Sequence, residues 1–147
     1  MPKTQKDLPQ DAALQAGLVT RNQVMGTEYV DRALAGASDY TMPMQEFITR
    51  NAWGNVWQRP GLDLKTRSLI TVAMLAAQGK QHELKAHVRG ALNNGVTPDE
   101  LREVMLHATV YCGFPTAIDA TAVRWRTRSS GTSSSSRPSA RCRAFGQ

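Results

Sequence analysis

The stretch "DLKTRSLITVAMLAAQGKQHELKAHVRGALNNGVTPDEL" (residues 63–101) decides the fold class, because it contains three consecutive helices with marked ends. Asp63 is a typical N-cap residue, and the segment Leu69–Ala77 behind it is apolar on all sides. Such a helix is normally the buried centre of a bundle or of an oligomer. Gly79 ends it, a second helix follows over 81–93, and "TPDE" is the capping box of the third.

The segments on either side of this stretch are also helical in pattern. Residues 11–25 and 27–36 predict two short helices, and residues 42–57 predict a third with Pro43 in its first turn. A last helix begins at Pro115, after the break "GFP". No segment alternates with the period of two that strands require. The sequence therefore predicts an all-α helical bundle.

The positive charge of the chain lies at one end. Residues 1–123 contain 12 Lys or Arg and 12 Asp or Glu, whereas residues 124–147 contain six Arg and no acidic residue, which accounts for the net charge of +6. The folded body thus has no basic surface of the kind that binds nucleic acid, and we expect no such partner. We predict one domain over 1–123, followed by a Ser/Arg-rich tail over 124–147 that is disordered or non-native.

The location of the protein follows from two further features. No apolar run approaches the roughly 20 residues of a membrane span, and the N-terminal segment has no signal-peptide apolar region. We therefore expect a cytoplasmic protein without a membrane partner. Cys112 and Cys142 lie far apart and form no CxxC, so they indicate neither a disulfide framework nor a zinc knuckle.

The segment "HELKAH" resembles the zinc-binding pattern H-E-x-x-H but has one extra residue. His82 and His87 are five positions apart, which is roughly 140° around a helix, so they cannot chelate one ion. We expect no metal. His87 falls instead within the apolar stripe of its helix, and His82 falls on another, solvent-exposed side. The stripe consists of Leu84, His87, Val88, Ala91 and Leu92.

Four side chains of the helix over 42–57 align on one face at helical spacing: Glu46, Arg50, Trp53 and Trp57. One interpretation is structural, with Glu46 and Arg50 in a surface ion pair and the tryptophans in core or interface packing. The other is functional, because a carboxylate, a cation and flat aromatic surface together make a pocket wall.

Three further candidates are less specific. His107 lies at the edge of its apolar stripe, one turn before Tyr111, where a hydrogen-bonded core histidine is equally consistent with the pattern. Arg67 and Arg89 are expected in solvent unless an anionic ligand holds them. His87 has the same alternative reading as a core histidine.

Three segments resemble one known family: "AWGNVWQRPGLDLKTRSL" (52–69), "HVRGALNNGVTPDEL" (87–101) and "LHATVYCGFP" (106–115). They are similar to the carboxymuconolactone decarboxylase family of the alkylhydroperoxidase-like superfamily, and the similarity runs from Tyr29 to Ala120. It implies the helical bundle of that superfamily, assembled as a homo-oligomer, either a trimer or a hexamer. The sequence "TAVRWRTRSS" departs from the helix with which such proteins usually continue.

The resemblance implies a carboxy-lyase without a cofactor. Its substrate would be 4-carboxymuconolactone, a lactone dicarboxylate that loses CO2 to give 3-oxoadipate enol-lactone in the protocatechuate branch of the β-ketoadipate pathway. A histidine on an apolar helix face suits protonation or oxyanion stabilisation. The catalytic candidates are, in order, His87, Glu46 and His107. The candidates for binding the substrate are Arg50, Arg67, Arg89 and Trp53.

Two alternatives remain open at this point. The peroxidase branch of the superfamily carries a CxxC whose second cysteine lies four residues before its histidine. Lys80 and Glu83 occupy those positions here, which argues against thiol peroxidase chemistry. The other alternative is a non-catalytic, oligomeric helical protein in which His87 has a structural role.

Overall fold

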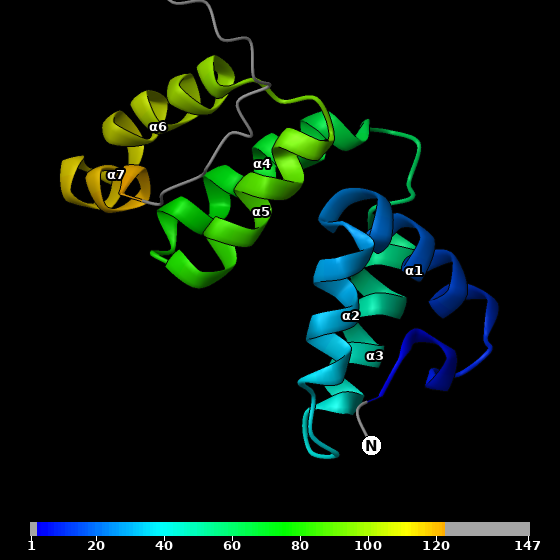
Figure 1. Ribbon diagram of the computed structural model, residues 1–147. Coiled ribbons are helices and arrows are strands. Elements are labelled where there is room, and N and C mark those ends of the chain that lie inside the picture. The colour runs from blue at the N-terminus through cyan, green and yellow to red at the C-terminus, as the bar shows by residue number, and fades with distance from the viewer. Residues whose placement is uncertain (1–2, 123–147) are drawn as a thin grey trace, which may run out of the picture.

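The computed structural model describes residues 3–122, and within them every regular element is a helix (Figure 1). The elements are, in chain order, η1 (Gln5–Asp7), α1 (Ala12–Met25), α2 (Thr27–Ala35), α3 (Met42–Ile48), the π-helix η2 (Thr49–Val56), α4 (Leu64–Ala77), α5 (Gln81–Asn93), α6 (Pro98–Cys112) and α7 (Phe114–Thr121). The all-α prediction is confirmed. The predicted tail, 124–147, lies outside the described residues.

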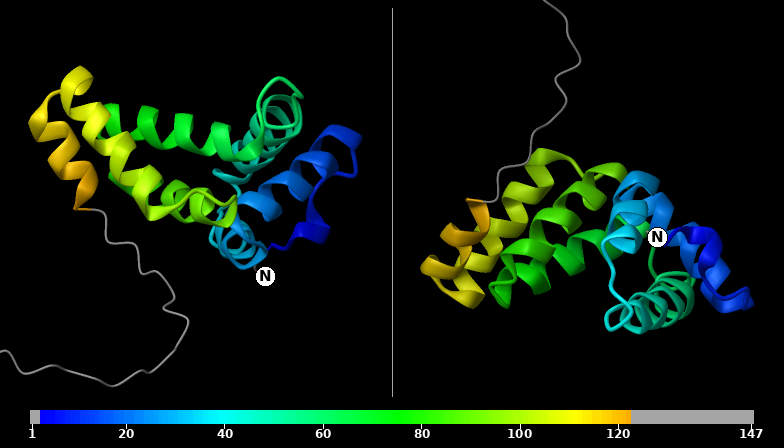
Figure 2. Two further views of the ribbon diagram at one scale, coloured as in Figure 1. Left: turned by 90° about the horizontal axis from the view of Figure 1, so that it is seen from above. Right: turned by 60° about the horizontal axis from the view of Figure 1, so that its bottom comes forward.

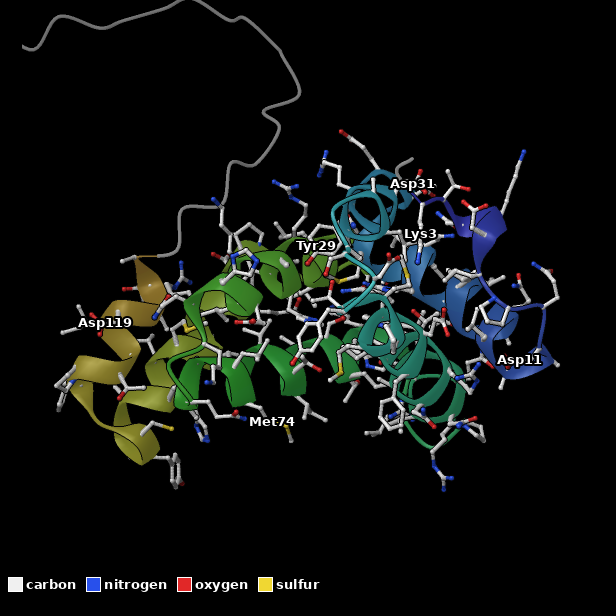
Figure 3. The ribbon with its side chains drawn as sticks, turned by 90° about the horizontal axis from the view of Figure 1, so that it is seen from below. Lys3, Asp11, Tyr29, Asp31, Met74 and Asp119 are labelled. Atoms are coloured by element: carbon white, nitrogen blue, oxygen red, sulfur yellow. The ribbon has the colours of Figure 1, made fainter. Side chains whose placement is uncertain are left out.

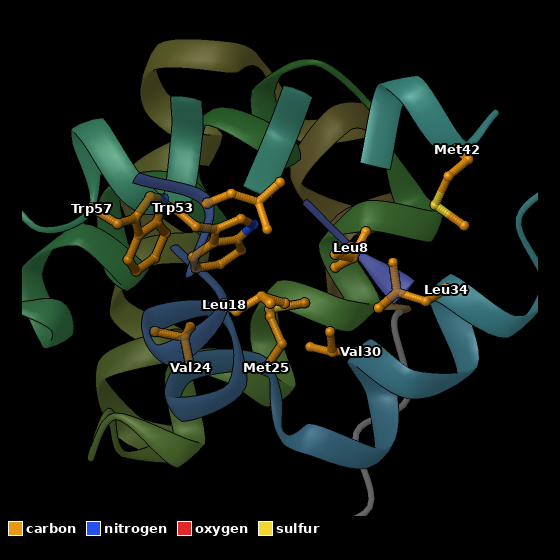
Figure 4. Close-up of a cluster of buried hydrophobic side chains, with 10 residues drawn as sticks. Leu8, Leu18, Val24, Met25, Val30, Leu34, Met42, Trp53 and Trp57 are labelled. Atoms are coloured by element: carbon orange, nitrogen blue, oxygen red, sulfur yellow. The ribbon is translucent and has the colours of Figure 1, made fainter. Parts of the chain in front are cut away.

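The helices bury two hydrophobic cores. The first is formed by the N-terminal elements and contains Leu14, Leu18, Val24, Trp53 and Trp57 among others (Figure 4). The second is formed by α4, α5, α6 and α7. Helices α4 and α5 pack side by side, with α1, α2 and α3 near one end of this pair and α7 near the other (Figures 1 and 2).

The helix ends follow the local signals of the sequence. The Asp63 carboxylate accepts a hydrogen bond from the Thr66 amide, as an N-cap does. Thr97 and Glu100 form the predicted capping box, in which each side chain accepts from the other residue's backbone N–H. Both predicted helix starts are confirmed.

The segment 42–57 differs from the single α-helix that its spacing predicts. It winds as an α-helix up to Ile48 and then as a π-helix from Thr49 to Val56, and Figure 1 draws the two as one coil. In a π-helix the backbone bonds to the fifth residue rather than the fourth, which changes where each side chain points. The four-residue alignment predicted for this segment therefore does not hold along its whole length.

Helix α4 is not enclosed by the chain itself. Val72 and Ala76 are fully buried, whereas Met74 is 57 % exposed and points away from the other helices (Figure 3). The chain by itself therefore covers only part of this helix, and burial of the rest in an oligomer stays a prediction. No helix among the described residues is long and apolar enough to cross a membrane.

Candidate active site

His87 lies half-buried on α5 against Trp53 of η2 and against Trp57, the residue that directly follows η2. Its ring centroid is 6.1 Å from that of Trp53, with the planes only 5° apart, and 6.4 Å from that of Trp57. Trp53 is 4 % exposed, and the two indoles lie 4.7 Å apart (Figure 4). His87 therefore has an aromatic, largely dry environment, whereas His82 is exposed, and both placements agree with the sequence prediction.

This environment decides the charge of His87. Desolvation by burial lowers the pKa of the imidazole, and the smaller effect of Glu83, one turn earlier on α5, acts in the opposite direction. At neutral pH the ring is therefore uncharged, with one nitrogen able to donate a hydrogen bond and the other able to accept one. A negative charge placed beside the ring would favour proton uptake.

The position of the tryptophans depends on a close crossing between α1 and η2. A Cβ on Gly17 would collide with the carbonyl oxygen of Thr49, and a Cβ on Gly54 would collide with the carbonyl oxygen of Ala13. Only glycine permits this approach of two backbones. The crossing holds the π-helix, and with it Trp53, against the N-terminal helices.

Arg50 does not pair with Glu46 as the structural interpretation of the sequence expected. Its guanidinium donates to the Asp11 carboxylate, with Nη2 2.6 Å from Oδ2 (Figure 3 shows Asp11 at the start of α1). Asp11 also caps α1 through the Leu14 amide. The ion pair of the structural interpretation is thus not formed, although the charge of Glu46 still helps to raise the pKa of Arg50.

The remaining predicted residues lie at different places. Glu46 is half-buried on α3 and, among the described residues, makes no hydrogen bond to His87. Arg67 donates to two backbone carbonyl oxygens, those of Leu62 and Arg59, and Arg89 is exposed on α5. Of the predicted residues, Trp53 lies beside His87. Arg67 instead stabilises the loop before α4 through its two hydrogen bonds.

His107 is exposed on α6, with its ring 4.7 Å from that of Tyr111. It lines a surface hollow of about 680 Å³ on α4 and α6, which also includes Tyr111 and Cys112. No residue of this hollow belongs to the aromatic group around His87. The structure therefore does not bring the first and third catalytic candidates together.

The sequence reasoning missed Arg21. This residue of α1 is only 6 % exposed, and it donates to Thr49 Oγ1 and Gln45 Oε1, each at 2.8 Å. The available signal was its spacing, because Arg21 falls in register with Leu14, Leu18 and Met25 on the buried side of its helix. A cation on an apolar stripe indicates a buried charge.

Within residues 3–122 the structure contains neither a pair of cysteines nor a group of metal ligands. Lys80 and Glu83 stand where the peroxidase branch has cysteines, and Cys112 is the free cysteine of the described chain, on α6. No group of three or more His, Cys, Asp or Glu within residues 3–122 is placed to hold a metal ion.

The model of the carboxymuconolactone decarboxylase family matches residues 43–124, which include His87 and both tryptophans. The chain belongs to the carboxymuconolactone decarboxylase family.

Two curated relatives are similar over most of their length. The nitrosuccinic acid decarboxylase of Metarhizium robertsii is 53 % identical over 111 residues, which cover 76 % of this chain and 78 % of the relative. The 4-carboxymuconolactone decarboxylase of Acinetobacter baylyi is 50 % identical over 99 residues, covering 67 % and 74 %. An uncharacterised 15.0 kDa protein of Paracoccus denitrificans is 35 % identical over 65 residues, or 43 % of this chain and 48 % of the relative.

Proposed function

We propose that this protein is a carboxy-lyase that decarboxylates 4-carboxymuconolactone to 3-oxoadipate enol-lactone without a cofactor. The observation that carries the proposal is the half-buried His87 against Trp53, in a chain 50 % identical to a 4-carboxymuconolactone decarboxylase. The aromatic surroundings supply the dry environment, and the histidine supplies the proton.

The chemistry needs no external electron acceptor, because the substrate contains its own. The bond between the ring carbon and the leaving carboxylate breaks, CO2 departs, and the electron pair moves through the ring double bond onto the lactone carbonyl. The resulting dienolate must then be protonated on carbon. One proton is consumed and one CO2 is released, so the reaction is balanced without a redox partner.

The protein contributes by removing water and by moving a proton. Water stabilises the negative charge of the leaving carboxylate, so an apolar wall such as Trp53 favours its conversion to neutral CO2. The free His87 is neutral, and the arriving anion raises its pKa, so that the bound imidazole takes up a proton. That imidazolium donates the proton to the dienolate carbon and is reprotonated from water.

Nitrosuccinate is the second candidate substrate, favoured by the 53 % identity to a nitrosuccinic acid decarboxylase. In both substrates, a group within the molecule accepts the electron pair that the departing CO2 leaves behind. In nitrosuccinate the nitro group beside the leaving carboxylate accepts the electron pair, as the lactone carbonyl does in the other substrate. Both are also dicarboxylates, so the same binding and proton-donating groups would suit either substrate.

We further propose that the protein works as a homo-oligomer. The exposed sides of α6 and α7 carry Val110, Tyr111, Phe114 and Ile118. Helix α4 adds the exposed Met74. Helix α6 packs against both α4 and α7, and large apolar side chains exposed on neighbouring helices are typical of an interface between subunits.

The experiment is a measurement of CO2 release from each substrate at equal protein concentration. We expect turnover of 4-carboxymuconolactone, and comparison of the two kcat/KM values identifies the preferred substrate. No release of CO2 from either would contradict the proposal and favour a non-catalytic helical protein. Turnover of a hydroperoxide by a thiol reductant, lost in Cys112→Ser, would favour the peroxidase alternative.

A further inference from the structure

Arg21 is a buried cation whose neighbours are neutral. Its Nη1 is 2.8 Å from the Thr49 hydroxyl, and its Nη2 is 2.8 Å from the Gln45 side-chain carbonyl. A guanidinium has five N–H donors, so these two bonds leave three without an acceptor among the described residues. Burial lowers the pKa of Arg21, and the nearby Tyr29 acts in the opposite direction.

This arrangement is unusual because buried charges are normally paired. Arg50 has Asp11 and Arg32 has Glu28, although both of these arginines are more exposed than Arg21. No carboxylate within residues 3–122 lies in ion-pair distance of Arg21. Arg21 is therefore a largely buried cation that is hydrogen-bonded to neutral side chains and has no ion-pair partner within residues 3–122.

Arg21 also adjoins the aromatic group. Its acceptor Thr49 is the first residue of η2, the π-helix that carries Trp53 and ends directly before Trp57. Val24 and Met25, one turn further along α1, belong to the same core as the tryptophans, and Ala86, the neighbour of His87, packs against that core. The cation and the histidine therefore border one cluster from two different helices.

We propose that Arg21 binds the carboxylate that the substrate retains, and thereby anchors the substrate beside the cluster that contains Trp53. This inference rests on the proposed function, because it takes a dicarboxylate as the ligand. Guanidinium and carboxylate form charge-assisted, often bidentate hydrogen bonds, which suit both the charge and the free donors of Arg21.

The retained carboxylate is the better match on chemical grounds. A guanidinium on the leaving carboxylate would stabilise the charged ground state and slow its conversion to neutral CO2. On the retained carboxylate the same bond persists unchanged through the reaction. Such uniform binding lowers KM without altering kcat, which separates an anchoring role from a role in the chemical step.

The test uses succinate, an unreactive dicarboxylate, and calorimetric titration. Wild type should bind succinate, and Arg21→Gln should weaken binding about 10- to 100-fold, the range expected for losing hydrogen bonds to a charged group. In the assay of CO2 release from the preferred substrate, Arg21→Gln should raise KM by a similar factor and change kcat much less. Arg32→Gln, an exposed arginine on α2, is the matched control and should bind succinate as wild type does.

Gln45→Glu is a second variant that does not depend on removing the buried charge. It places a carboxylate where the Gln45 oxygen already accepts from Arg21, so it supplies an internal counter-ion. We expect Tm to rise by about 2–4 °C and succinate binding to weaken at least about tenfold. If Arg21 were only structural, Tm would rise while succinate binding stayed unchanged.

The outcomes separate this inference from the proposed function. Succinate binding that depends on Arg21 supports it even if neither candidate substrate releases CO2, in which case only the proposed reaction fails. Unaltered succinate affinity in folded Arg21→Gln, or in Gln45→Glu, overturns it even if wild type is an active decarboxylase. Absence of dicarboxylate binding by wild type also overturns it.

Discussion

His87 depends on its surroundings for its resting state. Its ring stacks beside Trp53 and Trp57, and the loss of water there favours the uncharged imidazole. In the reaction that we propose, the neutral histidine takes up a proton when the anionic substrate arrives, so proton uptake would be coupled to substrate binding. The same burial affects stability, because protonation of this ring in acidic solution is less favourable in the folded state than in the unfolded state.

The first prediction concerns the pH dependence of unfolding. The pKa of His87 is lower in the folded than in the unfolded state, so the unfolded state binds more protons below about pH 6.5. The stabilising contribution of the neutral ring is fully present above that pH and is lost as the pH falls towards the folded pKa. We expect His87→Gln to reduce the loss of unfolding free energy between pH 7.5 and 5.5 in urea titrations.

The matched control is His82→Gln, because His82 is exposed on the same helix. It should retain the pH dependence of wild type. Identical pH dependence in wild type and His87→Gln would show that burial does not set the charge of His87.

The sequence identifies His87 but not its neighbours in space. Helix geometry separates His87 from His82 and places it on the buried side, and the structure agrees. The pairing of Arg50 with Asp11 joins residues far apart in the chain, and so does the bond between Arg21 and Thr49. Spacing within one helix carries no information about such pairs.

The contact between α1 and η2 is the element on which the candidate site depends. Gly17 and Gly54 each lie against backbone atoms of the other helix. Trp53 directly precedes Gly54 in the π-helix, and Trp57 directly follows the end of that helix. π-helical turns are rare and frequently lie at functional sites. The local winding and the backbone contact together explain why Trp53 reaches His87.

The second prediction tests this contact. In Gly17→Ala the new methyl group meets the Thr49 carbonyl and the Gly54 amide, neither of which is a flexible side chain. We expect a loss of at least about 1–3 kcal/mol in the free energy of unfolding, measured by urea denaturation. Near-ultraviolet circular dichroism should change as well, because Trp53 moves with η2.

Gly61→Ala is the control, since a Cβ at Gly61 meets no atom within 4 Å and its backbone does not require glycine. It should leave stability within about 0.5 kcal/mol of wild type or raise it slightly. Equal stability of the Gly17 and Gly61 variants would contradict the close crossing.

The α-helices can be predicted from the sequence, and the π-helix cannot. The N-caps at Asp63 and Thr97 are local signals, and the structure contains the bonds they predict. The segment from Thr49 onwards has no such signal, because the same apolar spacing is consistent with an α-helix. Its winding accompanies the contact with α1, which lies more than thirty residues earlier.

Residues 3–122 form two hydrophobic cores and leave several large apolar side chains exposed. The exposed residues of α6 and α7 are separated from the first core, and Met74 of α4 is exposed too. The apolar character of α4 is readable from the sequence, but the sequence does not show which sides the chain itself covers. That depends on how α5 and α6 pack against it.

The third prediction addresses the proposed assembly. Val110 is 78 % exposed on α6, and replacing it by arginine would place a charge in the interface that we propose. Analytical ultracentrifugation should show a trimer or hexamer for wild type and smaller species for Val110→Arg. Val19→Arg is the control, because Val19 is 69 % exposed on α1, away from this surface. A monomeric wild type, or equal dissociation by both variants, would contradict the assignment of the interface.

The most direct test of the central claim is the initial rate of CO2 release by wild type and His87→Gln, measured side by side on the preferred substrate at pH 7. The variant keeps a polar ring-sized side chain but cannot deliver a proton. We predict a loss of kcat of about 100-fold or more, with the far-ultraviolet circular dichroism unchanged. A folded His87→Gln variant that releases CO2 at the wild-type rate would contradict the account.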